Sequence, residues 1–506
     1  MKNPASTFVR FGVFSLAILL LLGGIAAAAF AQGGTGTITG TVTDPKGLSV
    51  PQAKVVIKST DTGLERPLET TDSGAYTATF LQPGHYEVSV SKDGFQTFVR
   101  KDLVLQVGQT LTVDVPMTVG TSVSEITVTG EAPLIEPDRT EFSQTVSESL
   151  AAGLPLNGRR WEQFVLLTPG VTTDGGSGLV SYHGISGLFN NSSVDGVSNQ
   201  QAFFSEDRGR TAVGYTYSLD AVKEFSVSSS AYSAEFGGAA GGQVNSITKS
   251  GSNAMHGDLF YYLRYPSFNA LDPYAKTHGS PPINGTTCTG GTTLSTEVNQ
   301  CIAPPSEHQR QQFGGAVGGP IIKDKLFYFV NYDGQRRSFP IIYTGPSTTN
   351  SFNAVSNMIA NNCTSQYNPT GTALSTLSVN GLTAAQCAAA VNLINANIGP
   401  QPRLANQDVY LGKLDYQATS KNHLSASFNF MNFRSPNGYD QSATFNAGSI
   451  LQNGNFGTHD RFLVANWNHD SASHPGAEGP DLIDYSAVQQ RAPTTRPDSP
   501  SLEFSK

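Results

Sequence analysis

Apolar and polar residues alternate along most of this chain, and a period of two predicts β-strands rather than helices. Between residues 34 and 120, successive segments such as Tyr76–Phe80 and Tyr86–Val90 have apolar residues at every second position. Turn signals such as Asp44–Gly47 separate these segments. Short alternating strands with a turn about every 8–12 residues predict a β-sandwich in this part of the chain.

A second group of alternating segments begins after residue 255, and its apolar positions are rich in aromatic residues. In Gly257–Tyr265 the odd-numbered residues form an apolar face, and in His423–Phe433 Leu424 and Phe428 oppose Ser427 and Asn429. Lipid-facing apolar residues alternating with lumen-facing polar ones are typical of a transmembrane β-barrel. A soluble sandwich with one solvated face has the same period, so the alternation alone leaves both open. We expect strands around 257–265, 312–320, 325–333, 408–417, 423–433 and 460–468.

The first residues predict export. Lys2 and Arg10 precede an uncharged apolar run, Phe11–Ala31, which ends in a small-x-small site. This pattern predicts a signal peptide over residues 1–31, cleaved between Ala31 and Gln32. An uncleaved membrane anchor is the alternative. Beyond Ala31 no apolar run is long enough for a membrane helix, so any membrane-spanning part must consist of strands.

Composition supports a β-rich exported protein. Only 14% of residues are charged, whereas the chain has 52 Gly, 28 Phe and 18 Tyr. The net charge of −8 gives no reason to expect a nucleic-acid partner, which would need basic patches. In an exported chain we expect the neighbouring cysteines to pair, Cys288 with Cys301 and Cys363 with Cys387, although other pairings and free thiols stay open.

Motifs for catalysis are nearly absent. Ser246 and Lys249 fit the S-x-x-K signature of acyl-enzyme nucleophiles, but the chain has no recognisable partner motif. The histidines form no H-E-x-x-H pair. We therefore expect neither enzymatic activity nor a metal or cofactor.

Several motifs carry a family resemblance. The segments "GTVTDPKGLSVPQAKVVI" and "TTDSGAYTATFLQPGHYEVSV" resemble the carboxypeptidase regulatory-like domain, a prealbumin-like sandwich with a carbohydrate-binding-like fold. No tryptophan that could stack on a sugar lies in this domain, because Trp161 and Trp467 lie elsewhere. Further along, "LPLNGRRWEQFVLLTPGV", "NNSSVDGVSNQ", "AVKEFSV" and "GGQVNSITKSGSN" resemble the plug domain of TonB-dependent outer-membrane receptors of the Oar-like branch.

This resemblance implies a domain order and a mode of action. We expect the sandwich at 32–120, the plug at 121–252, a partial outer-membrane β-barrel at 253–470 and an atypical tail at 471–506. The implied function is uptake of an unidentified small ligand, glycan or peptide through the outer membrane, driven by a TonB-like energy-coupling protein. The patch Glu125, Ile126, Thr127, Val128 and Thr129 resembles the segment that adds as a strand to this partner. An ordinary linker strand is the alternative.

The expected fold is therefore mainly β, with an N-terminal β-sandwich, a mixed α/β plug and an incomplete transmembrane β-barrel. A plugged receptor barrel has on the order of 22 strands, many more than the alternation predicts here. The alternation is also lost after Asp470, so we expect a truncated or frame-shifted barrel. An exported surface adhesion or carbohydrate-binding protein built from β-modules is the alternative function.

Overall fold

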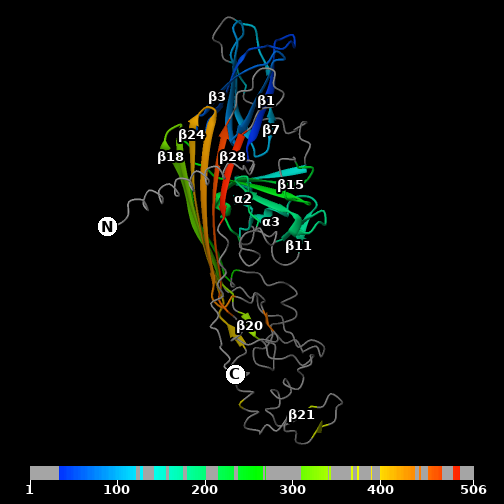
Figure 1. Cartoon of the computed structure of the whole chain (residues 1–506), viewed down its shortest axis with the longest axis vertical. Helices are drawn as coiled ribbons and strands as arrows, with labels where there is room; N and C mark the ends of the chain where they lie inside the picture. Colours follow the sequence, from blue (N-terminus) through cyan, green and yellow to red (C-terminus); the bar gives the residue numbers. More distant parts are fainter. Residues whose placement is uncertain are drawn as a thin grey trace, which may run out of the picture.

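The computed structural model describes most of the predicted domains. It covers residues 34–120, 126–128, 142–154, 159–174, 179–200, 215–232, 237–265, 309–339, 341–343, 401–438 and 454–469, and the backbone of a few shorter segments including 483–490. The predicted mainly β fold is confirmed, with a sandwich, a plug and a long curved sheet that we call the wall (Figure 1).

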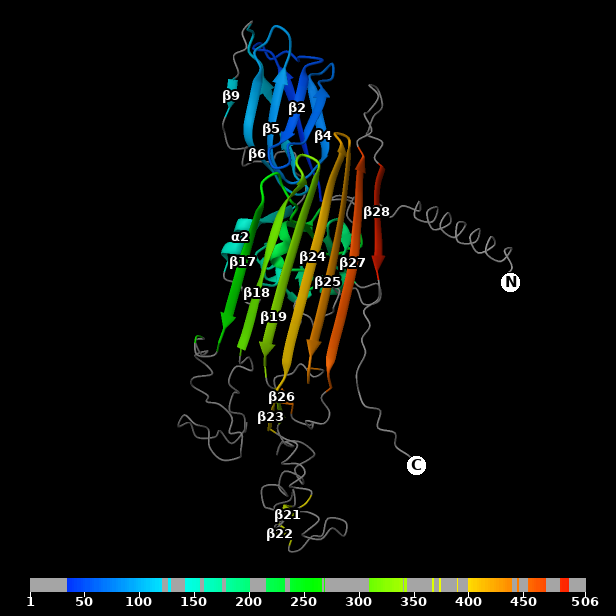
Figure 2. The same cartoon turned by 90° about the vertical axis from the view of Figure 1, so that its left-hand side faces the viewer.

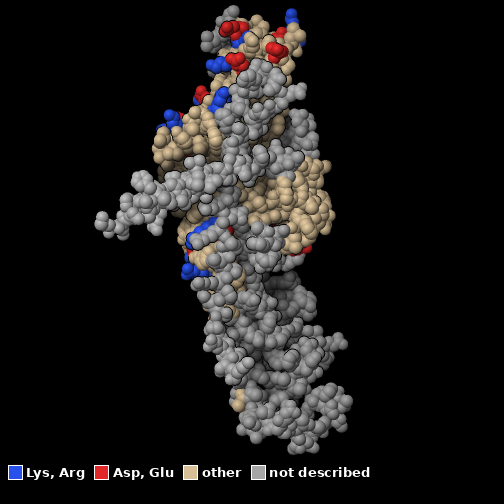
Figure 3. All heavy atoms as spheres, viewed as in Figure 1, with Lys and Arg blue, Asp and Glu red and all other residues tan. Residues whose placement is uncertain are grey.

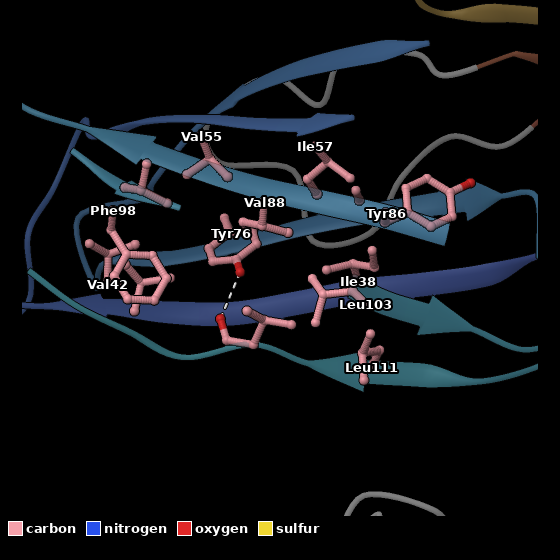
Figure 4. Packing of buried hydrophobic residues seen from close by; sticks show 14 of the residues in the cluster. Ile38, Val42, Val55, Ile57, Tyr76, Tyr86, Val88, Phe98, Leu103 and Leu111 are labelled. Atoms are coloured by element: carbon pink, nitrogen blue, oxygen red, sulfur yellow. Dashed lines mark hydrogen bonds between the residues drawn. The ribbon is translucent and has the colours of Figure 1, made fainter. Parts of the chain in front are cut away.

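The N-terminal domain is a sandwich of two sheets. One sheet contains β1 (Gly36–Thr43), β4 (Ala75–Leu81), β7 (Thr110–Thr112) and β8 (Val115–Pro116). The other has the order β3-β2-β5-β6-β9 and contains β2 (Lys54–Ser59), β3 (Glu65–Glu69), β5 (Gly84–Ser91), β6 (Phe98–Leu105) and β9 (Ile126–Val128). The side chains at the alternating positions predicted to be apolar point between the two sheets, as Figure 4 shows for Ile38, Val55 and Val88. Tyr76 crosses this core and donates its hydroxyl to the carbonyl of Val113 at 2.6 Å, so its polar atom is satisfied.

The plug is built on a five-stranded sheet with the order β10-β15-β16-β13-β14. Its strands are β10 (Phe142–Ser147), β13 (Asn191–Val194), β14 (Val197–Ser198), β15 (Val222–Ser230) and β16 (Gln243–Thr248), with a hairpin of β11 (Val171–Asp174) and β12 (Leu179–Tyr182). The helical elements are α2 (Glu148–Gly153), α3 (Trp161–Val165), η1 (Gly187–Phe189) and η2 (Leu219–Ala221). In α3, Phe164 packs edge-on against Phe225 of β15, with 5.8 Å between the ring centres.

The wall is a seven-stranded antiparallel sheet that curves around one side of the plug (Figures 1 and 2). In spatial order its strands are β17 (His256–Arg264), β18 (Gln309–Ile322), β19 (Leu326–Ser338), β24 (Leu404–Thr419), β25 (Asn422–Ser435), β27 (Phe456–His469) and β28 (Ile483–Gln490). The first six strands match the predicted ranges, except that residues 265 and 325 fall just outside β17 and β19. Strand β28 lies in the tail where no strand was expected, and it pairs with β27. Shorter strands are β20 (Ile341–Tyr343), β21 (Gln366–Tyr367), β22 (Ala373–Leu374), β23 (Gly399–Gln401) and β26 (Thr444–Phe445).

The two ends of the wall differ in how its strands are joined. Residues 323–325 join β18 to β19 and residues 420–421 join β24 to β25 at what we call the turn end. The ends of β17 and β18, of β19 and β24, and of β25 and β27 that are joined by longer stretches of sequence lie at the opposite, loop end, whereas residues 470–482 join β27 to β28 at the turn end. Figure 2 shows the sandwich next to the turn end. Within the part of the chain that the structure describes, no helix has the length and apolar character needed to cross a membrane.

Candidate functional site: the interface of plug and wall

The wall buries its polar face and exposes its apolar face. Along β24, Lys413 and Asp415 are buried toward the plug, whereas Leu414 and Tyr416 point outward and are 49% and 44% exposed. Buried polar side chains need hydrogen-bond partners. In this wall, many of those partners belong to the plug.

Asp195 of the plug is the centre of one such contact. It lies in the turn between β13 and β14 with a φ of 49°, a conformation that Asp tolerates better than most residues. Its carboxylate accepts hydrogen bonds from the amide and hydroxyl of Thr248 at 2.9 and 2.7 Å and from the hydroxyl of Ser427 in the wall at 3.1 Å. The ammonium of Lys413 lies 3.6 Å from the same carboxylate and donates to the Thr248 hydroxyl at 3.0 Å. One plug carboxylate thus contacts two wall strands.

Asp333 of β19 forms a second contact in the opposite direction, from wall to plug. Its two oxygens accept from the hydroxyl of Tyr215 at 2.8 Å and from the hydroxyl of Ser218 at 2.7 Å. The side-chain amide of Gln312 on β18 also donates to it, at 3.1 Å. Asp333 has no exposed surface, so these plug hydroxyls replace water as its hydrogen-bond donors.

Amide side chains of the wall make further contacts with η2 and the residues before it. Asn331 donates to the carboxylate of Asp220 at 2.9 Å, and Asn429 donates to the carbonyl of Thr216 at 2.9 Å. Burial raises the pKa of Asp220 to about 7, although Lys249 and Arg159 oppose this shift. The plug side of the interface therefore contains a carboxyl group that titrates near neutral pH.

Arg159 joins the plug to the first wall strand. Its guanidinium lies over the rings of Phe260 and Tyr262, 4.8 and 4.7 Å from their centres, as in a cation–π contact. Arg159 belongs to the "LPLNGRRWEQ" motif, which carried the family resemblance, but the motif did not reveal that this side chain packs on the wall.

The sandwich is attached to the plug at the turn end. The amide of Val107 donates to Glu224 at 2.6 Å, and the ammonium of Lys223 donates to the carbonyl of Pro83 at 2.5 Å. Burial raises the pKa of Glu224 to about 7 and lowers the pKa of Lys223. A cavity of about 600 Å³ lies where sandwich, plug and wall meet, with Arg66 and Phe327 among its lining residues.

The glycine-rich end of the plug touches the wall at one of its glycines. A Cβ on Gly251 would lie 2.4 Å from the carbonyl oxygen of Tyr328, so only glycine permits this close approach. Gly241 and Gly242 instead pack within the plug, against Asn190 and Tyr182. Of these three glycines, only Gly251 at the end of the stretch thus lies against the wall.

The predicted coupling segment is described only at its centre. Ile126–Val128 form β9, which pairs in parallel with Phe98–Arg100 of β6 and so completes a sheet of the sandwich, although it lies in the range expected for the plug. Glu125 and Thr129 lie outside the described residues, as do Ala31, Gln32 and the four cysteines.

The S-x-x-K match has a structural role. Ser246 is fully buried in β16 and its hydroxyl lies 3.0 Å from that of Tyr217, while Lys249 forms an ion pair with Glu148 at 2.8 Å. Among the described residues, no group of His, Cys, Asp and Glu could hold a metal ion.

Comparison with known proteins defines the class of the domains. Residues 247–474 match the family model of an outer membrane beta barrel domain, and residues 37–118 match that of a carboxypeptidase regulatory-like domain. The wall therefore belongs to an outer-membrane β-barrel domain, and the sandwich is a carboxypeptidase regulatory-like domain.

A curated relative gives a closer relationship. The chain is 28% identical over 316 residues to the TonB-dependent transporter Oar of Myxococcus xanthus. This match covers 60% of the chain and 27% of Oar, so the chain spans about a quarter of its relative. The predicted resemblance to Oar-like TonB-dependent receptors is confirmed.

Solved structures of outer-membrane receptors are also similar. The transporter YddB of Escherichia coli matches with a TM-score of 0.39 and 12% identity over 65% of this chain and 37% of YddB. The ferric enterobactin receptor PfeA of Pseudomonas aeruginosa matches with a TM-score of 0.39 and 14% identity over 65% of this chain and 39% of PfeA.

Proposed function

We propose that this protein acts as a TonB-dependent outer-membrane transporter, in which the wall is part of the barrel and the plug closes its lumen. The observation that carries the proposal is the inverted burial of the wall. Its outward face presents Leu259 at 91% and Phe428 at 49% exposure, whereas its inward face buries Asn429 and Asp333 completely. Such a sheet is suited to lipid on one side and to a polar plug on the other.

The connections of the wall give its orientation. Outer-membrane barrels have short turns on the periplasmic side and long loops outside. The turn end, with the sandwich next to it, then faces the periplasm, where an energy-coupling protein can reach it. The loop end faces the medium and receives the ligand, which is a small molecule, a glycan or a peptide.

The chemistry of the interface suits a plug that must move. Among the described residues its contacts combine buried hydrogen bonds and the ion pair of Asp195 with Lys413 with small separate apolar clusters, such as that of Val197 with Phe462 and Val464. Water can replace hydrogen-bond partners as the lumen opens, so each exchanged contact costs little net free energy. An apolar interface of the same area would resist hydration far more strongly.

The energy-coupling partner would act on the segment Glu125–Thr129. Its central strand β9 has a β-prone sequence and rests at the edge of the sandwich sheet. Strand addition to a partner is a common mode of recognition for such a segment. The next strand along the chain that the structure describes is β10, an edge strand of the plug sheet, so a pull on the segment would act on the plug from this edge.

The test compares Thr127→Pro with Thr127→Ser in the full-length protein. Proline removes an amide donor that strand addition needs, whereas serine keeps it. We expect wild type and both variants to fractionate with the outer membrane and to show heat-modifiable mobility on gels. Only Thr127→Pro should lose cross-linking to a TonB-like partner. A wild-type protein that is monomeric in buffer without detergent would contradict the proposal and support a surface adhesion or carbohydrate-binding protein.

A further inference from the structure

Three arginines lie side by side across the first three strands of the wall, at its loop end. In the antiparallel register Arg264 of β17 is directly opposite Arg310 of β18, and Arg310 is directly opposite Arg337 of β19. Directly opposed side chains lie about 4.5–5.5 Å apart at Cβ, and like charges in such positions are destabilising. Three neighbouring cations therefore destabilise the wall unless other groups interact with them.

The three arginines occupy alternate strand positions that belong to the face of the wall turned toward the plug. On β19, Arg337 lies on the same face as the buried Asn331 and Asp333. On β18, Arg310 lies on the same face as Gln312, which contacts Tyr215 of the plug. Arg264 shares its parity with Phe260, on which Arg159 of the plug stacks. The arginines thus belong to the lumen side of the wall.

The strands themselves supply no acidic neighbour for this row. The adjacent positions are glutamine, serine, aromatic, leucine or arginine residues: Tyr262, Leu263, Gln309, Gln311, Gln312, Gln335, Arg336 and Ser338. Asp333 lies four residues deeper, where its carboxylate is engaged by Tyr215 and Ser218. Arg264, Arg310 and Arg337 each also take part in at least one interaction within the chain.

A fourth arginine and an aromatic cluster extend the row. The guanidinium groups of Arg337 and Arg403 lie 4.2 and 4.0 Å from the ring centre of Phe339, and Arg403 donates to the Phe339 carbonyl at 3.0 Å. Phe339 packs in turn with Tyr215 and Phe433. Stacking fixes the plane of a guanidinium and directs its parallel N–H donors, the geometry that recognises carboxylate and phosphate groups.

We propose that Arg264, Arg310 and Arg337, supported by Arg403, form a binding site for the carboxylate or phosphate groups of an anionic ligand at the loop-end entrance of the lumen. Lys and Arg atoms gather over the lower part of the wall in Figure 3. The inference rests on the proposed transport function, and it narrows the ligand to one with at least two anionic groups, because the row spans three strands.

The experiment measures binding of citrate, inorganic pyrophosphate and uncharged sucrose to the full-length protein in detergent micelles by calorimetry. The variants are Arg310→Gln, Arg337→Gln and Arg310→Lys. Arg434→Gln is the matched control, because Arg434 lies near the same end of the wall but on its outward face. We expect at least one anion to bind the wild type, with affinity that falls as salt rises, and sucrose not to bind.

Each glutamine variant should weaken anion binding about tenfold or more, Arg310→Lys should weaken it less, and Arg434→Gln should leave it unchanged. The inference is overturned if neither anion binds the wild type, or if Arg434→Gln weakens binding as much as Arg310→Gln. Heat-modifiable mobility checks that each variant is folded. Thr127→Pro separates the two proposals, since it should bind anions normally and fail only in partner cross-linking.

Discussion

The sandwich and the wall have the same alternating pattern but bury opposite faces. In the sandwich Val55 and Val88 are fully buried, whereas in the wall Leu259 is 91% exposed and Asn429 is fully buried. A period of two specifies a strand in both regions. Which of the two alternating faces turns inward depends on what lies on each side of the sheet, namely water outside the sandwich and, in the proposed barrel, lipid outside the wall.

This difference also decides what holds each region together. The sandwich is stabilised by removing apolar side chains from water, at about 25 cal/mol per Å². The inner face of the wall also buries apolar side chains, such as Val409 and Met431, but in separate small clusters. Between these clusters it makes hydrogen bonds to the plug, some of them between side chains distant in sequence, such as Ser427 and Asp195, which are 232 residues apart.

The largest effect is expected from a charge in the sandwich core. Val88→Asp places a carboxylate among Ile57, Tyr76 and other buried side chains of the hydrophobic core. We expect a loss of about 4 kcal/mol or more in the free energy of unfolding of this domain. Limited proteolysis in urea should show cleavage within residues 34–120 at lower urea than in wild type. If the variant still shows heat-modifiable mobility, the wall is folded and the destabilisation is confined to the sandwich.

A smaller loss is expected from Asp195→Asn at the interface of plug and wall. The substitution keeps the shape of the side chain but leaves the buried ammonium of Lys413 without its carboxylate, at a cost of about 3 kcal/mol. The plug should then become accessible to protease at lower denaturant, while insertion of the wall is unchanged. The double variant with Lys413→Met should recover part of the loss, and equal instability of single and double variants would argue against the ion pair.

A charge placed on the outward face of the wall tests directly whether this face contacts lipid. Phe428→Arg, near the middle of β25, should weaken folding into phospholipid vesicles by about 2 kcal/mol, as measured by urea titration. Val104 of the sandwich is 48% exposed and supplies the control, because Val104→Arg places the same charge in water. That change should stay within about 0.5 kcal/mol. Equal effects of the two substitutions would mean that the wall faces water.

The pattern along the chain predicted the strands of both regions and the outward parity of the wall, because these properties repeat every two residues. It did not predict that Asp195, Asp333 and Lys413 join plug to wall. Asp195 lies in "SSVDGVS", which indicates a turn, and nothing in its neighbours shows what the turn faces. The position of β9 at the edge of the sandwich was also missed, since strand pairing between distant segments leaves no local pattern.

The last test concerns pH and the contact between sandwich and plug. Burial raises the pKa of Glu224 in the folded protein to about 7, above its ordinary value of 4.5. The folded state therefore binds this proton more tightly than the unfolded state, so its contribution to stability is full below about pH 4.5 and is lost as pH rises through about 7. Across these limits the wild type should lose up to about 3 kcal/mol more than Glu224→Gln, which can still accept from the Val107 amide but does not titrate. Asp220, whose pKa is also raised to about 7, is present in both proteins, so its contribution cancels in the comparison. The measurement is urea denaturation of both proteins in detergent from pH 4.5 to pH 8, and parallel curves would show that Glu224 does not carry its proton in the folded protein.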